Sequence, residues 1–212
     1  AKVIDSTSPN PNGYYWLGCE WSNLLLACSK CNGSNAKGNN FPILGNRVLN
    51  DSPFNHLGHF NRTPLIANRS PLIEEQPLLL NPEIDDPEQH LHFRYFGKIS
   101  GLTKKGHISI NIYKLNRNPL FKRRQEIVND YAGQLKRILF RYEAKYYTSK
   151  GFEKILKDFF KEIKSINISK QEYILWRRYI SNNFSKCILQ RVPLIYRHDI
   201  GKAFILYKQG KL

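Results

Sequence analysis

The residues best suited to chemistry are two cysteines with two residues between them, in the segment Cys28-Ser29-Lys30-Cys31. A turn with this spacing points two thiolates at one tetrahedral ion, and four such ligands close a structural zinc site. The other two cysteines, Cys19 and Cys187, are isolated, and the sequence has no second Cys-x-x-Cys pair. The sequence therefore provides half of a zinc site. The alternative is that Cys28 and Cys31 are two buried free thiols.

The residues around this pair follow a recognisable order. Asn23-Leu24 stands shortly before the cysteines, Asn32 follows them directly, and Lys37 comes five residues later. This order resembles the ββα-metal motif of the HNH endonucleases, in which Asn-Leu precedes Cys-x-x-Cys, and a His or Asn and then a Lys open the metal-binding helix. The last His of that motif corresponds to Asn32 in this sequence.

Segments elsewhere in the chain narrow the resemblance to the HNH nuclease subunit of Septu and retron anti-phage defence systems, the PtuB type. In chain order these segments are Tyr14-Tyr15-Trp16-Leu17, Glu20 to Leu25, Phe41-Pro42-Ile43, Glu75 to Pro82, Asp86 to Leu91 and Leu115-Asn116-Arg117. The similar regions are residues 13–45 and 75–128.

The resemblance implies a metal-dependent endonuclease that hydrolyses phosphodiester bonds of DNA or RNA. It implies that Asn23 holds the loop bearing the general base through hydrogen bonds; the alternative is that Asn23 is a plain loop or turn residue. It also implies that Asn32 ligates a catalytic Mg or Mn ion, and that Cys28 and Cys31 share a structural Zn with two upstream cysteines. The family's general-base His and its first cysteine pair precede the Tyr-Tyr-Trp-Leu stretch, and we expect both upstream of Ala1.

The resemblance further implies a cytoplasmic complex with an SMC/ABC-like ATPase subunit, joined in a retron by a reverse transcriptase and its multicopy single-stranded DNA. Two other functions stay open. One is a catalytically inactive nucleic-acid-binding subunit with a purely structural zinc knuckle. The other is a scaffold whose basic helices grip an acidic partner protein.

Composition points to a polyanionic partner. The chain has 212 residues, with 33 Lys and Arg against 17 Asp and Glu, giving a net charge of +16. Such a surplus favours nucleic acid, and no apolar run reaches the ~20 residues of a spanning helix. The hydrophobic fraction of 41% argues against disorder.

The positive charge is concentrated in the second half of the sequence. Residues 1–93 carry 6 basic and 9 acidic residues, whereas residues 94–212 carry 27 basic and 8 acidic residues. The candidates for contact with a phosphate backbone are Lys37, Arg117, Arg123, Arg124, Arg137 and Arg141. A lysine stripe from Lys150 to Lys164 is interleaved with acids, and we interpret it as a solvated helix face.

These patterns predict an α+β fold. Within residues 1–93, the resemblance implies a ββα-metal nuclease core without its His strand, and the prolines predict an irregular segment after it. Residues 94–212 are expected to hold a β-hairpin and a basic helical region. Tyr14 to Leu26 is expected to be core. The two hairpin strands are expected at Leu91–Tyr95 and Ile108–Ile112, because apolar and polar residues alternate there.

Helical periodicity is clear further along. It predicts a long helix over residues 120–147, a second from Phe152 to Ile163, and a third over 169–184 with Ser169 as its N-cap. A short strand is expected from Phe204 to Tyr207.

The remaining polar candidates favour structural roles. His90 is expected at a helix start or core edge. Asp85 and Asp86, which precede Pro87, are expected to form a capping turn. His56 and His59 are expected at the surface of a loop.

Overall fold

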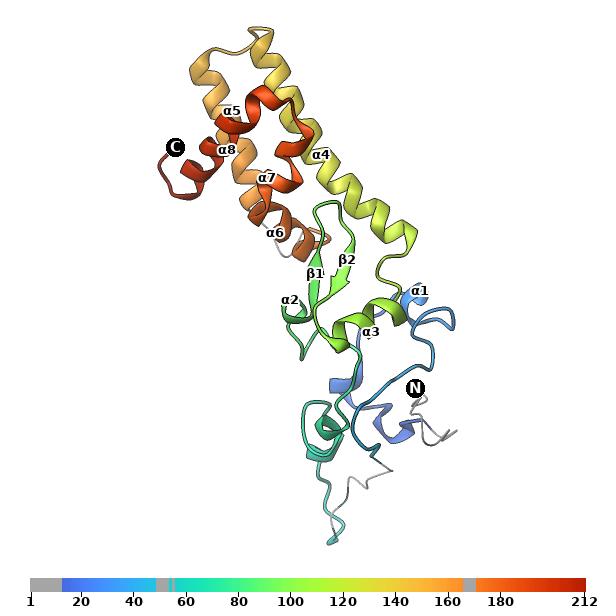
Figure 1. Cartoon of the computed structure of the whole chain (residues 1–212). Coiled ribbons are helices and arrows are strands. Elements are labelled where there is room, and N and C mark those ends of the chain that lie inside the picture. The colour runs from blue at the N-terminus through green and yellow to red at the C-terminus, as the bar shows by residue number, and fades with distance from the viewer. Residues whose placement is uncertain (1–12, 49–53, 55, 166–170) are drawn as a thin grey trace. The chain divides into compact units, whose positions relative to one another are not determined.

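The computed structural model (Figure 1) describes residues 13–48, 54, 56–165 and 171–212. The chain divides into two compact units. Unit 1 consists of Ala1–His92 and Ile99–Asn116, and unit 2 consists of Phe93–Lys98 and Arg117–Leu212. Unit 2 contains 24 basic and 8 acidic residues, whereas unit 1 contains 9 of each. The net charge of the chain therefore belongs to unit 2.

Unit 1 is built mainly from turns and short elements. These are α1 (Ser29–Asn32), α2 (Pro87–His90), β1 (Leu91–Phe93), β2 (Ile99–Gly101) and α3 (Lys104–Ile112), with 3-10 turns at Tyr15–Leu17, Trp21–Asn23, Thr63–Leu65 and Leu72–Glu75. β1 and β2 form an antiparallel hairpin whose tip is counted with unit 2. A small cluster of Leu17, Leu65 and Leu72 provides a core. Helices together with this small sheet confirm the α+β class.

The second strand of the hairpin differs from the prediction. β2 lies at Ile99–Gly101, and the predicted strand residues Ile108, Ile110 and Ile112 belong to helix α3. The Thr103 side chain accepts a hydrogen bond from the Gly106 amide at 3.1 Å and so caps this helix. A capped N-terminus satisfies an amide that would otherwise lack a partner. The alternating isoleucines therefore mark a helix, in which Ile108 and Ile112 share one face.

Helix α3 lies unusually close to the end of α2. A Cβ added at Gly106 would stand only 2.0 Å from the His90 carbonyl oxygen. The Leu102 amide donates to the same oxygen at 2.8 Å. Only glycine allows this approach, because any side chain would push α3 away from His90.

Unit 2 is helical. Its helices are α4 (Asn118–Glu143), α5 (Ser149–Lys164), α6 (Ile174–Asn182), α7 (Phe184–Cys187) and α8 (Leu194–Lys208), with a 3-10 turn at Leu189–Arg191. The core includes Phe160, which is fully buried and contacts the rings of Phe184 and Phe204 edge-on. Trp176 is 1% exposed and donates its indole N–H to the Arg124 carbonyl at 2.8 Å.

Helices α4 and α5 confirm the first two predicted helices. The third predicted helix is shorter than expected and begins at Ile174, and Ser169 lies outside the described residues. The predicted strand at Phe204–Tyr207 is wrong, because these residues belong to α8. Phe204 is buried, whereas the next residue of α8, Ile205, is 58% exposed. The helix therefore buries the face that carries Phe204 and exposes the face that carries Ile205. Among the described helices, none combines the length and apolar character needed to cross a bilayer.

Two glycine substitutions test this packing. We expect Gly106→Ala to destabilise the protein by about 1–3 kcal/mol or more, because the new methyl group overlaps the His90 carbonyl. Gly133→Ala is the matched control in the interior of α4, where the added Cβ would meet only the end of Arg137 at 3.6 Å. We expect that variant to gain about 0.5–1 kcal/mol. Chemical denaturation measures both, and equal effects would contradict the close approach.

Candidate functional site

The two cysteines of the Cys-x-x-Cys pair converge in unit 1. Cys28 precedes the single-turn helix α1, and its carbonyl accepts from the amides of Cys31 and Asn32, both at 3.0 Å. The Cys28 and Cys31 sulfurs stand 3.1 Å apart. Cys28 is exposed and Cys31 is half-buried, so the alternative of two buried thiols is wrong.

This geometry fits half of a tetrahedral zinc site. Two thiolates on one zinc, with bonds of about 2.3 Å, lie about 3.8 Å apart, which a small rotation of either side chain would provide. Within the part of the chain that the structure describes, no group of three or more His, Cys, Asp and Glu side chains converges. The described residues therefore provide two ligands of such a site. Asn32, in the same helical turn, is exposed.

Asn23 belongs to a clamp that joins two distant segments of unit 1, formed by Glu20, Ser22 and Asn23. The Asn23 amide donates to the Leu65 carbonyl at 3.2 Å, and the Ser22 hydroxyl accepts from the Ala67 amide at 3.3 Å. Asn23 therefore fixes the chain around Leu65, and its expected role in holding the loop of the general base stays a prediction.

Glu20 is the charged member of this clamp. Its carboxylate accepts from Arg62 Nε at 2.9 Å and Nη2 at 2.5 Å, and it also caps the following turn by accepting from the Ser22 amide. The Arg62 guanidinium, followed by the Ser22 amide, lowers the pKa of Glu20 to about 2. A bidentate pair of this kind has a fixed geometry that a single-point ammonium contact lacks.

The expectation that all of Tyr14 to Leu26 is core is wrong for its second half. Leu17 is 8% exposed, but Trp21 is 78% exposed and Leu26 lies fully in solvent. The clamp holds the polar side chains of Glu20, Ser22 and Asn23 against the protein. The apolar side chains of Trp21 and Leu26 therefore point to solvent.

A cavity of about 700 Å³ lies within unit 1 and brings together two of the predicted site residues, Asn23 and Lys37. Cys28, Cys31 and Asn32 do not line it. The Lys37 amine approaches the Gly38 carbonyl at 3.5 Å, and burial lowers its pKa. A half-buried ammonium in an apolar cavity gains by binding an anion, because the anion offsets its lost hydration.

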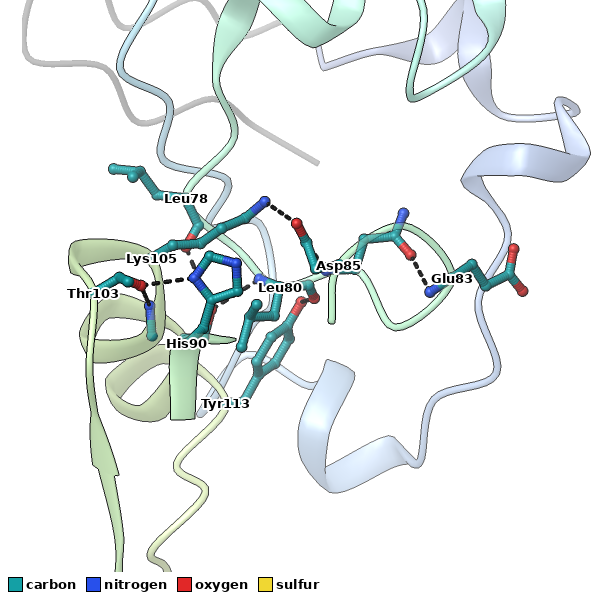
Figure 2. A network of polar contacts seen from close by, with 11 residues as sticks. Leu78, Leu80, Glu83, Asp85, His90, Thr103, Lys105 and Tyr113 are labelled. Atoms are coloured by element: carbon teal, nitrogen blue, oxygen red, sulfur yellow. Dashed lines mark hydrogen bonds and ion pairs between the residues drawn. The ribbon is translucent and has the colours of Figure 1, made fainter. Parts of the chain in front are cut away.

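Helix α3 holds one wall of this cavity, the segment Leu78–Asp85, in place (Figure 2). Lys105, Ser109 and Tyr113 follow one another at four-residue intervals, so they share a helix face. Lys105 pairs with Asp85 at 2.6 Å, and the Tyr113 hydroxyl donates to the Leu80 carbonyl at 3.4 Å. The buried Ser109 hydroxyl accepts from the Leu80 amide at 2.8 Å and donates to the Leu78 carbonyl at 3.3 Å.

Among the neighbouring polar residues, Asp86, His56 and His59 take the structural roles expected of them, whereas His90 lies half-buried at the end of a helix and not at a helix start. His90 ends α2, and its Nδ1 lies 2.7 Å from the Thr103 hydroxyl. Asp86 caps α2 by accepting from the Glu88 amide at 3.0 Å. His56 and His59 are exposed in their loop.

Sequence reasoning missed Glu75, which also lines the cavity. It is 2% exposed and accepts from the Tyr14 hydroxyl and the Val48 amide, both at 2.7 Å. Burial raises the pKa of this carboxyl, and the two hydrogen bonds oppose that shift. In the sequence, Glu75 stands out only as the start of a segment that resembles the HNH subunits, and nothing in its neighbours indicates burial. The residue after it, Gln76, is left-handed (φ 50°), which no local pattern reveals.

The basic candidates of unit 2 differ in their surroundings. Arg137 and Arg141 are exposed on α4, and Arg123 pairs with Glu126 at 3.2 Å. Arg117 stands at the N-cap of α4. Arg124 is 2% exposed and donates Nε to the Gly97 carbonyl at 2.5 Å, so it cannot reach a phosphate backbone as the sequence suggested. Its guanidinium instead joins the hairpin tip to α4.

Comparison with known proteins supplies the deciding observation. Over 120 residues, 56% of this chain, the sequence is 38% identical to the Septu protein PtuB of Bacillus mycoides (strain KBAB4). The chain is thus similar in sequence to a Septu protein. It is also 25% identical over 186 residues, 88% of this chain, to the Septu protein PtuA of the same strain.

The matches to the Septu proteins cover only part of each relative. The aligned region spans 35% of PtuB and 23% of PtuA. No family model matches the chain, and no solved structure matches it.

The Glu20–Arg62 pair makes the stability of unit 1 depend on pH. Because the folded-state pKa of Glu20 lies near 2, below the usual 4.5, its contribution is complete above about pH 4.5 and is lost as the pH falls through about 2. We expect the melting temperature of wild type to approach that of Glu20→Gln across this range. Glu83→Gln, at an exposed position, is the control. A difference in melting temperature between wild type and Glu20→Gln that stays constant down to pH 2 would contradict the pairing of Glu20 with Arg62.

Proposed function

We propose that the chain belongs to a metal-dependent HNH nuclease subunit that hydrolyses phosphodiester bonds of DNA or RNA in Septu-type defence. The convergence of the Cys28 and Cys31 sulfurs, with Asn32 directly after them, carries this proposal. The similarity to PtuB supports the defence role. The order Asn23, Cys28, Cys31, Asn32 and Lys37 agrees with the HNH motif.

Hydrolysis of a phosphodiester requires a deprotonated water and stabilisation of the leaving oxygen. A bound Mg or Mn ion supplies the charge that stabilises that oxygen. Asn32 offers an exposed carboxamide oxygen beside the cysteine pair, as a ligand for such an ion. Lys37 offers an ammonium that neutralises phosphate charge, and Asn23 keeps the chain near Leu65 in place. The paired cysteines hold this turn together and take no part in the reaction.

The proposed complex includes further partners. An SMC/ABC-like ATPase subunit is the proposed protein partner, with a reverse transcriptase and multicopy single-stranded DNA in a retron locus, and the cytoplasm as the site of action. The confinement of excess positive charge to unit 2 favours division of labour, with cleavage in unit 1 and binding in unit 2.

The same charge distribution supports a second candidate, a nucleic-acid-binding or scaffold subunit whose zinc knuckle is structural only. It differs from the nuclease in one measurable respect, because it binds without cutting. Substitution of Asn32 separates the two functions.

We expect Asn32→Ala in the intact protein to reduce cleavage at least about 100-fold, the upper range for loss of a group that supports a metal. Nucleic-acid binding is expected to stay within about twofold of wild type, because binding energy comes from phosphate contacts elsewhere. Asn35→Ala, at another exposed asparagine of the same turn region, is the matched control and should cut normally. Cleavage assays with Mg or Mn and filter binding measure the two effects. A binding loss as large as the cleavage loss would make Asn32 structural, and uncut substrate with wild type would favour the second candidate.

The binding role of unit 2 is tested at α4. We expect Arg137→Glu with Arg141→Glu to weaken nucleic-acid binding, and to flatten the slope of log affinity against log salt by about 0.7–0.9 for each phosphate that is no longer neutralised. The control is Lys154→Glu with Lys161→Glu, at exposed positions of α5. Affinity should be measured from about 50 to 200 mM salt. An unchanged slope together with failure to bind a protein partner would show that this face is an assembly surface.

A further inference from the structure

Unit 2 contains a groove between the C-terminal half of α4 and the start of α8. Its volume is about 500 Å³. The lining residues from α4 are Lys136, Leu139, Phe140 and Glu143, and the others are Gln190, Arg191, Val192, Pro193, Tyr196 and Arg197. This groove plays no part in the proposed cleavage, which we assign to unit 1.

Large apolar side chains are exposed in the groove and in the turn that follows its lining residue Pro193. Leu139 and Val192 are each 2% exposed and form a buried base, whereas Phe140 is 66% exposed. Leu194 and Ile195, in the helical turn after Pro193, are 76% and 72% exposed. Apolar side chains beside a hollow, rather than scattered singly, are typical of a surface that another protein covers.

The groove also presents fixed positive charge. Arg197 donates Nε to the Val192 carbonyl at 3.0 Å and Nη2 to the Gln190 carbonyl at 2.9 Å. Arg191 donates to the Cys187 carbonyl. A guanidinium has five N–H donors, so both side chains keep donors for a further acceptor while the backbone holds them in place.

The cations of the groove have no acidic partner within the described part of the chain. Among those residues, no Asp or Glu lies within ion-pair distance of Lys136, Arg191 or Arg197. The one carboxylate in the lining, that of Glu143, accepts a hydrogen bond from the Tyr196 hydroxyl. An occupant with carboxylates would complement this groove.

We propose that the groove docks a segment of a partner protein in which acidic side chains flank a leucine or phenylalanine anchor. The carboxylates would meet Lys136, Arg191 and Arg197, and the anchor would pack against Phe140. A nucleic acid would satisfy the cations but would bring no aliphatic side chain to the apolar base formed by Leu139 and Val192. The combination of both surfaces favours protein over nucleic acid.

Two synthetic helical peptides test the proposal by fluorescence anisotropy with the intact protein. One carries leucine and phenylalanine on one face with glutamates beside them, and the other has glutamine in place of each glutamate. We expect the glutamate peptide to bind at least about tenfold more tightly, since buried charge pairs and aromatic anchors dominate such interfaces. Phe140→Ala should weaken its binding about tenfold, and Lys136→Glu should weaken it as well.

Ile205→Ala is the matched control, at an exposed apolar position of α8 that does not line the groove. We expect it to change affinity less than about twofold. Phe140 is mostly exposed, so circular dichroism should show both variants folded. Equal binding of the two peptides, or binding unaffected by Phe140→Ala, would overturn the proposal. Displacement of the glutamate peptide by a single-stranded oligonucleotide whose own binding falls equally in Phe140→Ala would assign the groove to nucleic acid instead.

Discussion

The buried hydroxyl of Ser109 is the contact on which unit 1 depends most. The Leu78 amide donates to the Pro42 carbonyl at 2.9 Å, beside the bridge between Ile43 and Pro77. In the described structure no strand pairing continues from there to Asp85, so the buried backbone groups of this segment need other partners. Ser109 provides both a donor and an acceptor, to Leu78 and Leu80, from a side chain that is fully buried. Lys105 and Tyr113 lie on the same face as Ser109, about one helical turn before and after it. They contact Asp85 and the Leu80 carbonyl. These hydrogen bonds and the ion pair hold the irregular segment in place against α3. The segment forms a wall of the cavity that Asn23 and Lys37 also line.

Periodicity in the sequence is sufficient where one helix face is buried along a long element. In α4, Val128, Tyr131, Leu135 and Leu139 recur at helical spacing and are all buried, and this pattern predicted the helix. The same reasoning failed at Ile108–Ile112, because apolar residues at every second position are also compatible with a short helix. The Thr103 cap there is a local contact with Gly106, but the close approach at Gly106 depends on the distant His90 carbonyl, which no local pattern reveals.

The candidate site was predictable in its order and less so in its surroundings. The spacing of Cys28 and Cys31 implied converging thiols, and their sulfurs do converge. Residue type alone placed Arg124 on the surface with the other arginines. Its burial depends on a hairpin tip more than twenty residues earlier, whose Gly97 carbonyl accepts from it. Charge is a reliable guide to exposure only where no distant backbone group offers a partner.

The hairpin tip also limits how this protein can be divided or recombined. Phe93–Lys98 lies within the stretch of sequence that otherwise forms unit 1, yet it belongs to unit 2. It supplies the Phe93 ring that packs against Trp176, at 5.4 Å between centroids, and the carbonyl that holds Arg124. A gene segment starting at Arg117 would encode every helix of unit 2 but would omit these partners, leaving a buried guanidinium without its acceptor. The hairpin tip is therefore a structural part of the helical unit, and any recombination that transfers this unit must carry the hairpin with it.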